Sequence, residues 1–348
     1  MTQINSKISD KRLDLLRAWL EKDLGYSIEK LEPASADASF RRYFRAYSKG
    51  QSYIVMDAPP QQEPLSPFIN TAQALISQNV HAPKIFAQNI SAGFLLLEDF
   101  GDQTYLDALK ARSSSADALY EDAIAALIDC QSGIHAQTSI ELADYSAEKL
   151  NEEMEIFSDW YLGKHLGLQL NEQQIRLWDS TKEYLIGACL EQPEVWVHRD
   201  YHSRNLMLIE GNNPGVIDFQ DMVIGPIAYD LASIFKDCYI EWPREQQLIW
   251  LENYRKLAVE KLDIAIESKQ LIRWYDLTGL QRHLKVLGIF CRLYHRDGKS
   301  NYLNDLPLTA RYVLEVLPRY PELNAFEKTF SEFIRLAQTD IQDHGIVV

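Results

Sequence analysis

Hydrophobic and polar residues follow two different periods along the chain, and the change falls near residue 100. Before it, Leu13, Leu16 and Leu20 recur at helical spacing after Asp10, a residue type that caps helices well. Short apolar runs separated by Gly, Ser and Asn then predict strands at 27–33, 40–47, 52–58, 84–89 and 94–97, a small-residue loop at 34–39 and a helix at 64–79.

After Gly101 the helical period dominates. We expect helices at 115–136, 149–163, 171–190, 243–262 and 268–296, with further helices opening near 104, 225 and 326. The pattern predicts an α+β protein with two lobes: residues 1–98 carry a small antiparallel sheet, and residues 99–348 are mostly helical.

One hairpin interrupts the helical half. Residues 195–218 read VWVHRDYHSRNLMLIEGNNPGVID, which contains the spacing H-R-D-x-x-x-x-N and then an apolar strand ending in Asp218. Antiparallel strands of similar length would return Asp218 to Asn205. Phosphoryl transfer from ATP needs a base at the acceptor hydroxyl and oxygen ligands for Mg²⁺. We therefore assign Asp200 as the base and Asn205 and Asp218 as metal ligands.

The alternative is that these polar side chains only form turns and caps, as single Asp residues in loops usually do. For two further residues, Asp230 and His198, we expect a structural role rather than a catalytic one. Asp230 lies near the start of the helix that follows Gly225-Pro226, where it would cap that helix or brace the catalytic loop. His198 would support the same loop.

Composition and charge narrow the class of protein. The 348 residues suffice for two lobes with sizeable cores, and 46% of them are hydrophobic. A net charge of -15 argues against nucleic acid or an anionic membrane as the main partner. No apolar leader or run of eighteen apolar residues is present, and the four cysteines are scattered. We expect a cytoplasmic protein with reduced thiols and no obligate protein partner.

Several phrases resemble a known family. HRDYHSRN, VIDFQD and GPIAYDLAS are similar to the aminoglycoside phosphotransferase and choline kinase-like family, over roughly residues 25–300. SADASFRRYFR, VMDAPP, LLLEDFG and HLKVLGIFCRL resemble, within it, the bacterial sugar kinases that act on N-acetylmuramate and N-acetylglucosamine. The resemblance implies a protein-kinase-like fold, ATP and Mg²⁺ as cofactors, and phosphorylation of the anomeric hydroxyl of an amino sugar.

The nucleotide side departs from protein kinases. Met56 stands where the strand should carry a phosphate-binding lysine, and no G-x-G-x-x-G is present. Arg41 and Arg45 share one strand face with Tyr43 and could replace the lysine; the alternative is a solvated edge. Backbone near Ser39 would cover the phosphates, and the crossover with Glu98 and Phe100 would meet the adenine.

On the acceptor side, Arg282 and Lys285 share a stripe with Arg292 on the helix at 268–296. This stripe could bind a carboxylate such as the lactyl group of N-acetylmuramate, or it could be a solvated charged face. Trp160 could stack on a sugar, although aromatic residues at helical spacing are more often core. Two alternatives remain open: a kinase for a cationic acceptor, such as an aminoglycoside or choline, and a nucleotide-binding pseudokinase that acts as an interaction module.

Overall fold

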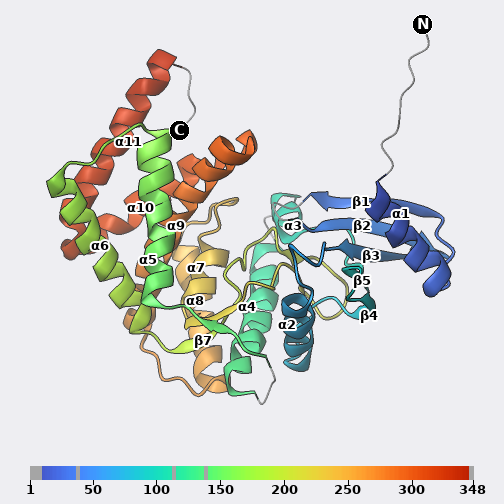
Figure 1. The fold of residues 1–348 in the computed structure, drawn as a ribbon. Coiled ribbons are helices and arrows are strands. Elements are labelled where there is room, and N and C mark those ends of the chain that lie inside the picture. Colours follow the sequence, from blue (N-terminus) through green and yellow to red (C-terminus); the bar gives the residue numbers. More distant parts are fainter. Residues whose placement is uncertain (1–9, 37–39, 112–114, 137–139, 345–348) are drawn as a thin grey trace, which may run out of the picture.

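A five-stranded antiparallel sheet forms the N-terminal lobe of the computed structural model, which describes residues 10–36, 40–111, 115–136 and 140–344 (Figure 1). The strand order is β1-β2-β3-β5-β4. The strands are β1 (Lys30–Ala36), β2 (Arg42–Ser48), β3 (Gln51–Asp57), β4 (Ile85–Asn89) and β5 (Phe94–Glu98).

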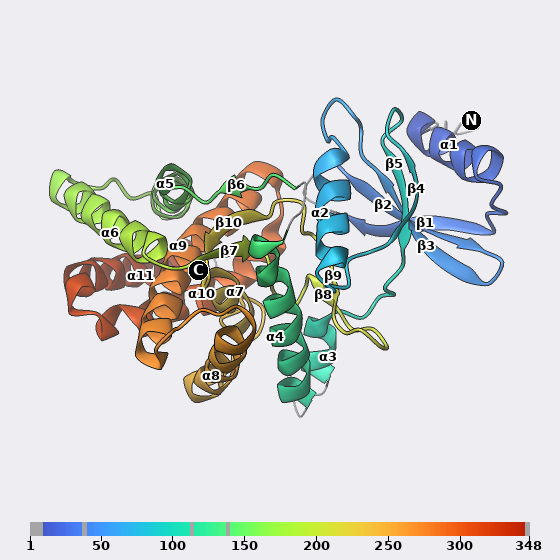
Figure 2. The same cartoon turned by 90° about the horizontal axis from the view of Figure 1, so that it is seen from below.

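The two faces of this sheet carry different helices (Figure 2). Alternation along β2 points Phe44 and Ala46 to the outer face, where they pack under α1 (Lys11–Ala18) and its π-helical continuation (Trp19–Asp23). The opposite face meets α2 (Ser66–Ser77) and the rest of the molecule. The strand alternation predicted for β2 is therefore present.

A buried carboxylate ties α1 to the outer face. Asp57 has no exposed surface, and it accepts hydrogen bonds from Arg12 Nε at 2.8 Å and from Arg42 Nε at 3.0 Å. Both arginines remain partly exposed, so their charges keep contact with water while the carboxylate is neutralised.

The second lobe is mostly helical and surrounds α9. Its helices are α3 (Tyr105–Ala111), α4 (Ala116–Ser132), α5 (Ala147–Ile156), the π-helix η4 (Phe157–His165), α6 (Glu172–Leu190), α7 (Tyr229–Phe235), α8 (Arg244–Lys261), α9 (Ser268–Asp297), α10 (Leu306–Val316) and α11 (Asn324–His344), with short 3₁₀ turns at Gly133–His135, Ser300–Asp305, Leu317–Arg319 and Pro321–Leu323. The middle of α9 is buried on nearly every side. It is the central helix of this lobe.

Two small sheets carry the loops between helices. One has the order β6-β10-β7, with β6 (Ala143–Asp144), β7 (Glu194–Val197) and β10 (Val223–Pro226). The other pairs β8 (Leu206–Met207) with β9 (Gly215–Val216). In the described part of the chain, no helix has the length and apolar character needed to cross a bilayer.

The α+β prediction is confirmed, although some elements differ in detail. Strand β1 runs to Ala36, and its register with β2 shifts between Pro33 and Ser35. A proline is tolerated there because β1 is an edge strand, so its missing N–H breaks no second ladder. The helix α10 and the β6-β10-β7 sheet were not predicted from the sequence.

Candidate active site

A buried carboxylate fixes the backbone of the loop that follows β7. Asp230, at the start of α7, accepts the backbone N–H of His198 at 2.7 Å and that of Arg199 at 3.0 Å. Arg199 has a φ of 77°, a conformation that a non-glycine residue adopts only when its surroundings impose it. Burial raises the pKa of Asp230 to about 7, although the two N–H donors oppose that shift.

His198 fastens the same loop to the strand that leads to Asp218. Its Nε2 lies 3.0 Å from the Ile217 carbonyl oxygen, and the ring is almost fully buried. Burial lowers the pKa of His198 to about 4, so the ring is neutral at pH 7 and donates from Nε2.

Asp200 follows directly, and it is exposed to solvent. Enough protein surrounds it that desolvation would raise its pKa, yet the charges of His202, Lys285 and Arg282 outweigh that effect and hold the pKa below its usual value. Asp200 is therefore an ionised carboxylate at neutral pH, as a proton acceptor must be.

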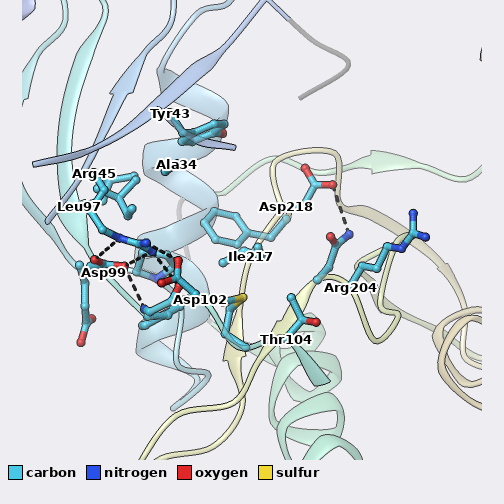
Figure 3. A pocket seen from close by; sticks show the side chains of 18 of the residues that line it. Ala34, Tyr43, Arg45, Leu97, Asp99, Asp102, Thr104, Arg204, Ile217 and Asp218 are labelled. Atoms are coloured by element: carbon cyan, nitrogen blue, oxygen red, sulfur yellow. Dashed lines mark hydrogen bonds and ion pairs between the residues drawn. The ribbon is translucent and has the colours of Figure 1, made fainter. Parts of the chain in front are cut away.

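One asparagine amide joins the two acidic segments. Asn205 Nδ2 donates to the Asp200 carbonyl oxygen at 3.0 Å and to Asp218 Oδ2 at 3.3 Å, a contact drawn in Figure 3. Neither bond uses Asn205 Oδ1. Asp218 has a φ of 65°, and its other oxygen accepts Gln220 Nε2 at 2.8 Å. The hairpin thus brings together the residues that the spacing predicted.

A cavity of about 480 Å³ opens between the lobes beside Asn205 and Asp218 (Figure 3). Tyr43 and Ile54 line it from the sheet, and Met207 and Ile217 line it from the other lobe. The crossover from Glu98 to Asp102 closes one end. An apolar slot with a few polar groups at its ends is the usual form of a small-molecule site.

Arg45 lies at the crossover end of this cavity. Its Nε donates to Asp99 Oδ2 at 2.7 Å, its Nη2 donates to the Gly101 carbonyl oxygen at 2.9 Å, and it also pairs with Asp102 (Figure 3). These contacts place Arg45 as a brace between the sheet and the crossover.

Glu98 and Phe100 line the cavity too. Glu98 accepts the backbone N–H of Lys84 at 3.2 Å, and the Phe100 ring lies so close to Gly215 that an added Cβ would be 2.6 Å from it. Ser39 lies outside the described residues.

Arg41 lines a second, smaller cavity next to the first. Its Nε donates to Glu63 Oε2 at 3.2 Å, and Met56, Gln220 and Asp221 line the same space. Phe68 lines both cavities, and its ring packs on Phe219 with centroids 4.8 Å apart.

On the basic stripe of α9, the interpretation as a solvated face is wrong for Arg282 and Lys285, which are 3% and 8% exposed, whereas Arg292 is only partly buried. Lys285 Nζ lies 3.0 Å from Glu153 Oε1 and donates to Tyr229 Oη at 3.1 Å. Among the described residues, the Arg282 guanidinium has one hydrogen bond, a long one of 3.8 Å to Cys238 Sγ.

Glu153 of α5 is a buried charged residue that was not predicted from the sequence. It also accepts Arg199 Nη2 at 2.6 Å. Burial would raise its pKa, but Lys285 and Arg199 lower it below the usual value. A signal existed: Glu153 lies three residues after Leu150 and four before Phe157, on the buried stripe of its helix.

Trp160 lies on η4, half-buried against the hydrophobic cluster of the helical lobe. It does not line either cavity described above. Trp160 packs against buried hydrophobic side chains of that cluster.

Comparison with known proteins adds a family. The sequence matches the phosphotransferase enzyme family over residues 30–263. The N-acetylmuramate/N-acetylglucosamine kinase of Pseudomonas putida is 43% identical over 334 residues, which cover 93% of this chain and 97% of that relative. The kinase of the same name from Neisseria meningitidis is 38% identical over 312 residues, which cover 88% of this chain and 92% of the relative.

Solved structures show the fold. The crystal structure of a choline kinase from Streptococcus pneumoniae has a TM-score of 0.61 at 12% identity and covers 87% of this chain and 99% of its own. An aminoglycoside phosphotransferase in complex with gentamicin has a TM-score of 0.57 at 16% identity, covering 90% and 97%. The predicted protein-kinase-like fold is confirmed.

Proposed function

The chain belongs to the phosphotransferase enzyme family, and from this premise we propose that it transfers the γ-phosphoryl group of ATP to the anomeric hydroxyl of an amino sugar, N-acetylmuramate or N-acetylglucosamine. The relatives named for these two sugars match nearly the whole chain. We also place the activity in the cytoplasm, a location supported by four cysteines that are all free and buried.

The observation that carries the proposal is the Asn205 amide between the Asp200 loop and Asp218. This amide connects the loop of Asp200, an ionised and solvent-exposed carboxylate, to Asp218. The side chains of Asn205 and Asp218 both line the interlobe cavity. Phosphoryl transfer needs this combination, because catalysis consists mainly of positioning and charge stabilisation.

ATP would bind in the cavity with its base toward the crossover. The apolar side chains Ile54, Met207 and Ile217 suit the two faces of an adenine ring, and backbone groups between Glu98 and Gly101 suit its polar edge. Arg45 would keep that crossover in place through its ion pair with Asp99. The phosphates would then extend toward Asp218.

The donor set near the phosphates fits Mg²⁺. Asp218 supplies a carboxylate and Asn205 a carbonyl oxygen, both hard ligands, and Mg²⁺ commonly binds through one or two such groups together with substrate phosphates. When bound, Mg²⁺ would neutralise charge on the β- and γ-phosphates. The bond from Asn205 Nδ2 orients the amide so that Oδ1 stays available for the metal.

Asp200 would act on the acceptor. Its carboxylate would accept the proton of the attacking hydroxyl as the new oxygen–phosphorus bond forms and the bond from the γ-phosphorus to ADP breaks. The two backbone N–H donors to Asp230 and the His198 bond to Ile217 hold the Asp200 backbone in position. The hydroxyl is thereby aligned as well as deprotonated.

Arg282 and Lys285 would line the acceptor side. Both are buried and both influence Asp200 electrostatically. Lys285 forms an ion pair with Glu153, whereas the guanidinium of Arg282 has only a sulphur partner among the described residues. Arg282 is therefore suited to bind an anionic acceptor group such as a lactyl carboxylate. A buried arginine disfavours cationic acceptors. We leave Trp160 out of this site because its contacts are with the core.

The test is Mg²⁺-dependent consumption of ATP by the full chain with four acceptors: N-acetylmuramate, N-acetylglucosamine, kanamycin and choline. We expect turnover on the two amino sugars alone. Turnover only on kanamycin or choline would replace the acceptor in this proposal. Nucleotide binding without turnover on any acceptor would favour a pseudokinase, for which Met56 in place of lysine is the specific support.

A further inference from the structure

The position that carries a phosphate-binding lysine in protein kinases is apolar here. Met56 on β3 is fully buried and pairs with Tyr43 of β2. The partner that this lysine needs is missing too, because α2, with the sequence SPFINTAQALIS, contains no acidic residue. Protein kinases rely on an ion pair between that strand and that helix to hold the phosphates in place.

An ion pair of the same type lies one step away. Arg41 immediately precedes β2, and Glu63 lies in the segment just before α2. Their side chains are 12% and 20% exposed, and Arg41 Nε lies 3.2 Å from Glu63 Oε2. Met56 lines the same small cavity. Arg41 thus precedes β2, the strand paired with β3, and Glu63 precedes α2, so both members of the pair lie just outside the expected strand and helix.

This pair faces the segment that carries Asp218. Gln220 and Asp221 line the small cavity together with Arg41. Gln220 Nε2 donates to Asp218 Oδ1 at 2.8 Å and to Asp221 Oδ2 at 3.3 Å. Phe68 lines both the small cavity and the large one. Arg41 is therefore next to the nucleotide cavity at its Asp218 end, away from the crossover that Arg45 braces.

We propose that Arg41, held by Glu63, positions the phosphates of the nucleotide and replaces the missing lysine–glutamate pair. The planar guanidinium can bind Glu63 along one edge and a phosphate along the other, which an ammonium cannot do as specifically. This inference rests on the proposed function, since it requires a nucleotide in the large cavity.

The test measures binding of ADP and of adenosine to the full chain by titration calorimetry. Arg41→Ala weakens ADP binding about 10- to 100-fold, the effect of losing charge-assisted hydrogen bonds, and leaves adenosine binding unchanged. Arg41→Lys recovers part of the ADP affinity, and Glu63→Gln loses part of it.

Arg42→Ala is the matched control. Arg42 is the next residue on the strand, but it points to the outer face and pairs with Asp57 and Asp10. The Arg42→Ala variant is less stable than the wild type, but its affinity for ADP is unchanged. Unchanged ADP affinity in Arg41→Ala, or an equal loss for ADP and adenosine, overturns the inference. A wild-type chain that binds neither ligand overturns the proposed function itself.

Discussion

Two aspartates in the helical lobe have opposite environments. Asp230 is buried and its carboxylate is bonded to two backbone N–H groups, whereas Asp200 reaches solvent and keeps a lowered pKa. The first shapes the loop and the second can accept a proton. Their environments, not their residue type, separate a structural role from a chemical one.

Asp200→Asn should reduce turnover by about 10²- to 10⁴-fold, the usual contribution of a positioned general base. The amide keeps the shape of the carboxylate but cannot accept the proton. ADP affinity should stay near that of the wild type, because Asp200 does not line the nucleotide cavity. Steady-state kinetics and calorimetry measure the two effects. A parallel loss of ADP affinity would contradict the assignment.

Arg282→Gln should discriminate between the two sugars. We expect kcat/KM for N-acetylmuramate to fall about 10- to 100-fold, because a charge-assisted hydrogen bond to its carboxylate is lost. N-acetylglucosamine, which has no carboxylate, should lose much less. Arg273→Gln is the control on the same helix, since Arg273 is a surface residue paired with Glu191. Equal losses for both sugars would exclude a carboxylate contact.

Only some of the candidate site residues could be predicted from the sequence. Asp200, Asn205 and Asp218 could be found because a short hairpin brings them together over a few residues. The burial of Arg282 and Lys285 could not be predicted, because their partners come from distant segments: Glu153 and Tyr229 for Lys285, and Cys238 for Arg282. Glu63 was missed for the same reason: its partner Arg41 is on another element.

At the scale of elements, α9 contains two glycines that have different surroundings. A Cβ at Gly288 would lie 2.3 Å from the Ile156 carbonyl oxygen, where α5 passes into η4. A Cβ at Gly279 would lie 3.5 Å from the Ala232 Cβ, an ordinary contact. Gly288 is therefore required for the close packing of α9 against the junction of α5 and η4. At Gly279 the structure has room for a larger side chain.

Gly288→Ala should therefore lower the free energy of unfolding by about 1–3 kcal/mol, because backbone must move to admit the methyl group. Gly279→Ala should be neutral or should raise it by up to about 1 kcal/mol, through better helix propensity. Urea denaturation of both variants measures the difference. Equal stability of the two would contradict the packing described here.

Periodicity predicted the long elements well and the short ones poorly. The helix expected at 268–296 is Ser268–Asp297, because thirty residues give the apolar period many repeats. The strands of the β6-β10-β7 sheet have two to four residues each, too few for any period to be visible. Their pairing is set by distant partners rather than by local pattern.

At the scale of the whole molecule, the lobes meet along the large cavity. Val216 N–H donates to the His81 carbonyl oxygen at 2.9 Å, and Phe68 packs on Phe219. These contacts connect α2 and the segment that follows it to the chain between Val216 and Phe219. The division of the chain after residue 98 stays a prediction, although β5 ends at Glu98.

Stability should fall as the pH decreases from about 6.5 to about 5. Burial lowers the pKa of His198 to about 4 and that of His283 to about 3, so both are neutral when folded but bind protons when unfolded. Asp230, with a pKa raised to about 7, acts in the opposite direction. Burial also lowers the pKa of His165 to about 4 and lowers the pKa of His202, so the unfolded chain binds more protons than the folded chain across this window and stability falls with the pH.

Urea denaturation across this pH range measures the slope. The ion-paired carboxylates with lowered pKa values, such as Glu153, lose their contribution at more acidic pH and do not dominate this window. Equal or greater stability at the lower pH would contradict the neutral state of these histidines.

The most direct test of the central claim is the position of the phosphate in the product. The full chain would be incubated with ATP, Mg²⁺ and N-acetylmuramate, and the product examined by phosphorus and proton nuclear magnetic resonance. We predict a sugar 1-phosphate, with the phosphorus coupled to the anomeric proton. A phosphate on any other hydroxyl, or no phosphorylated sugar while ATP is bound, would contradict the account.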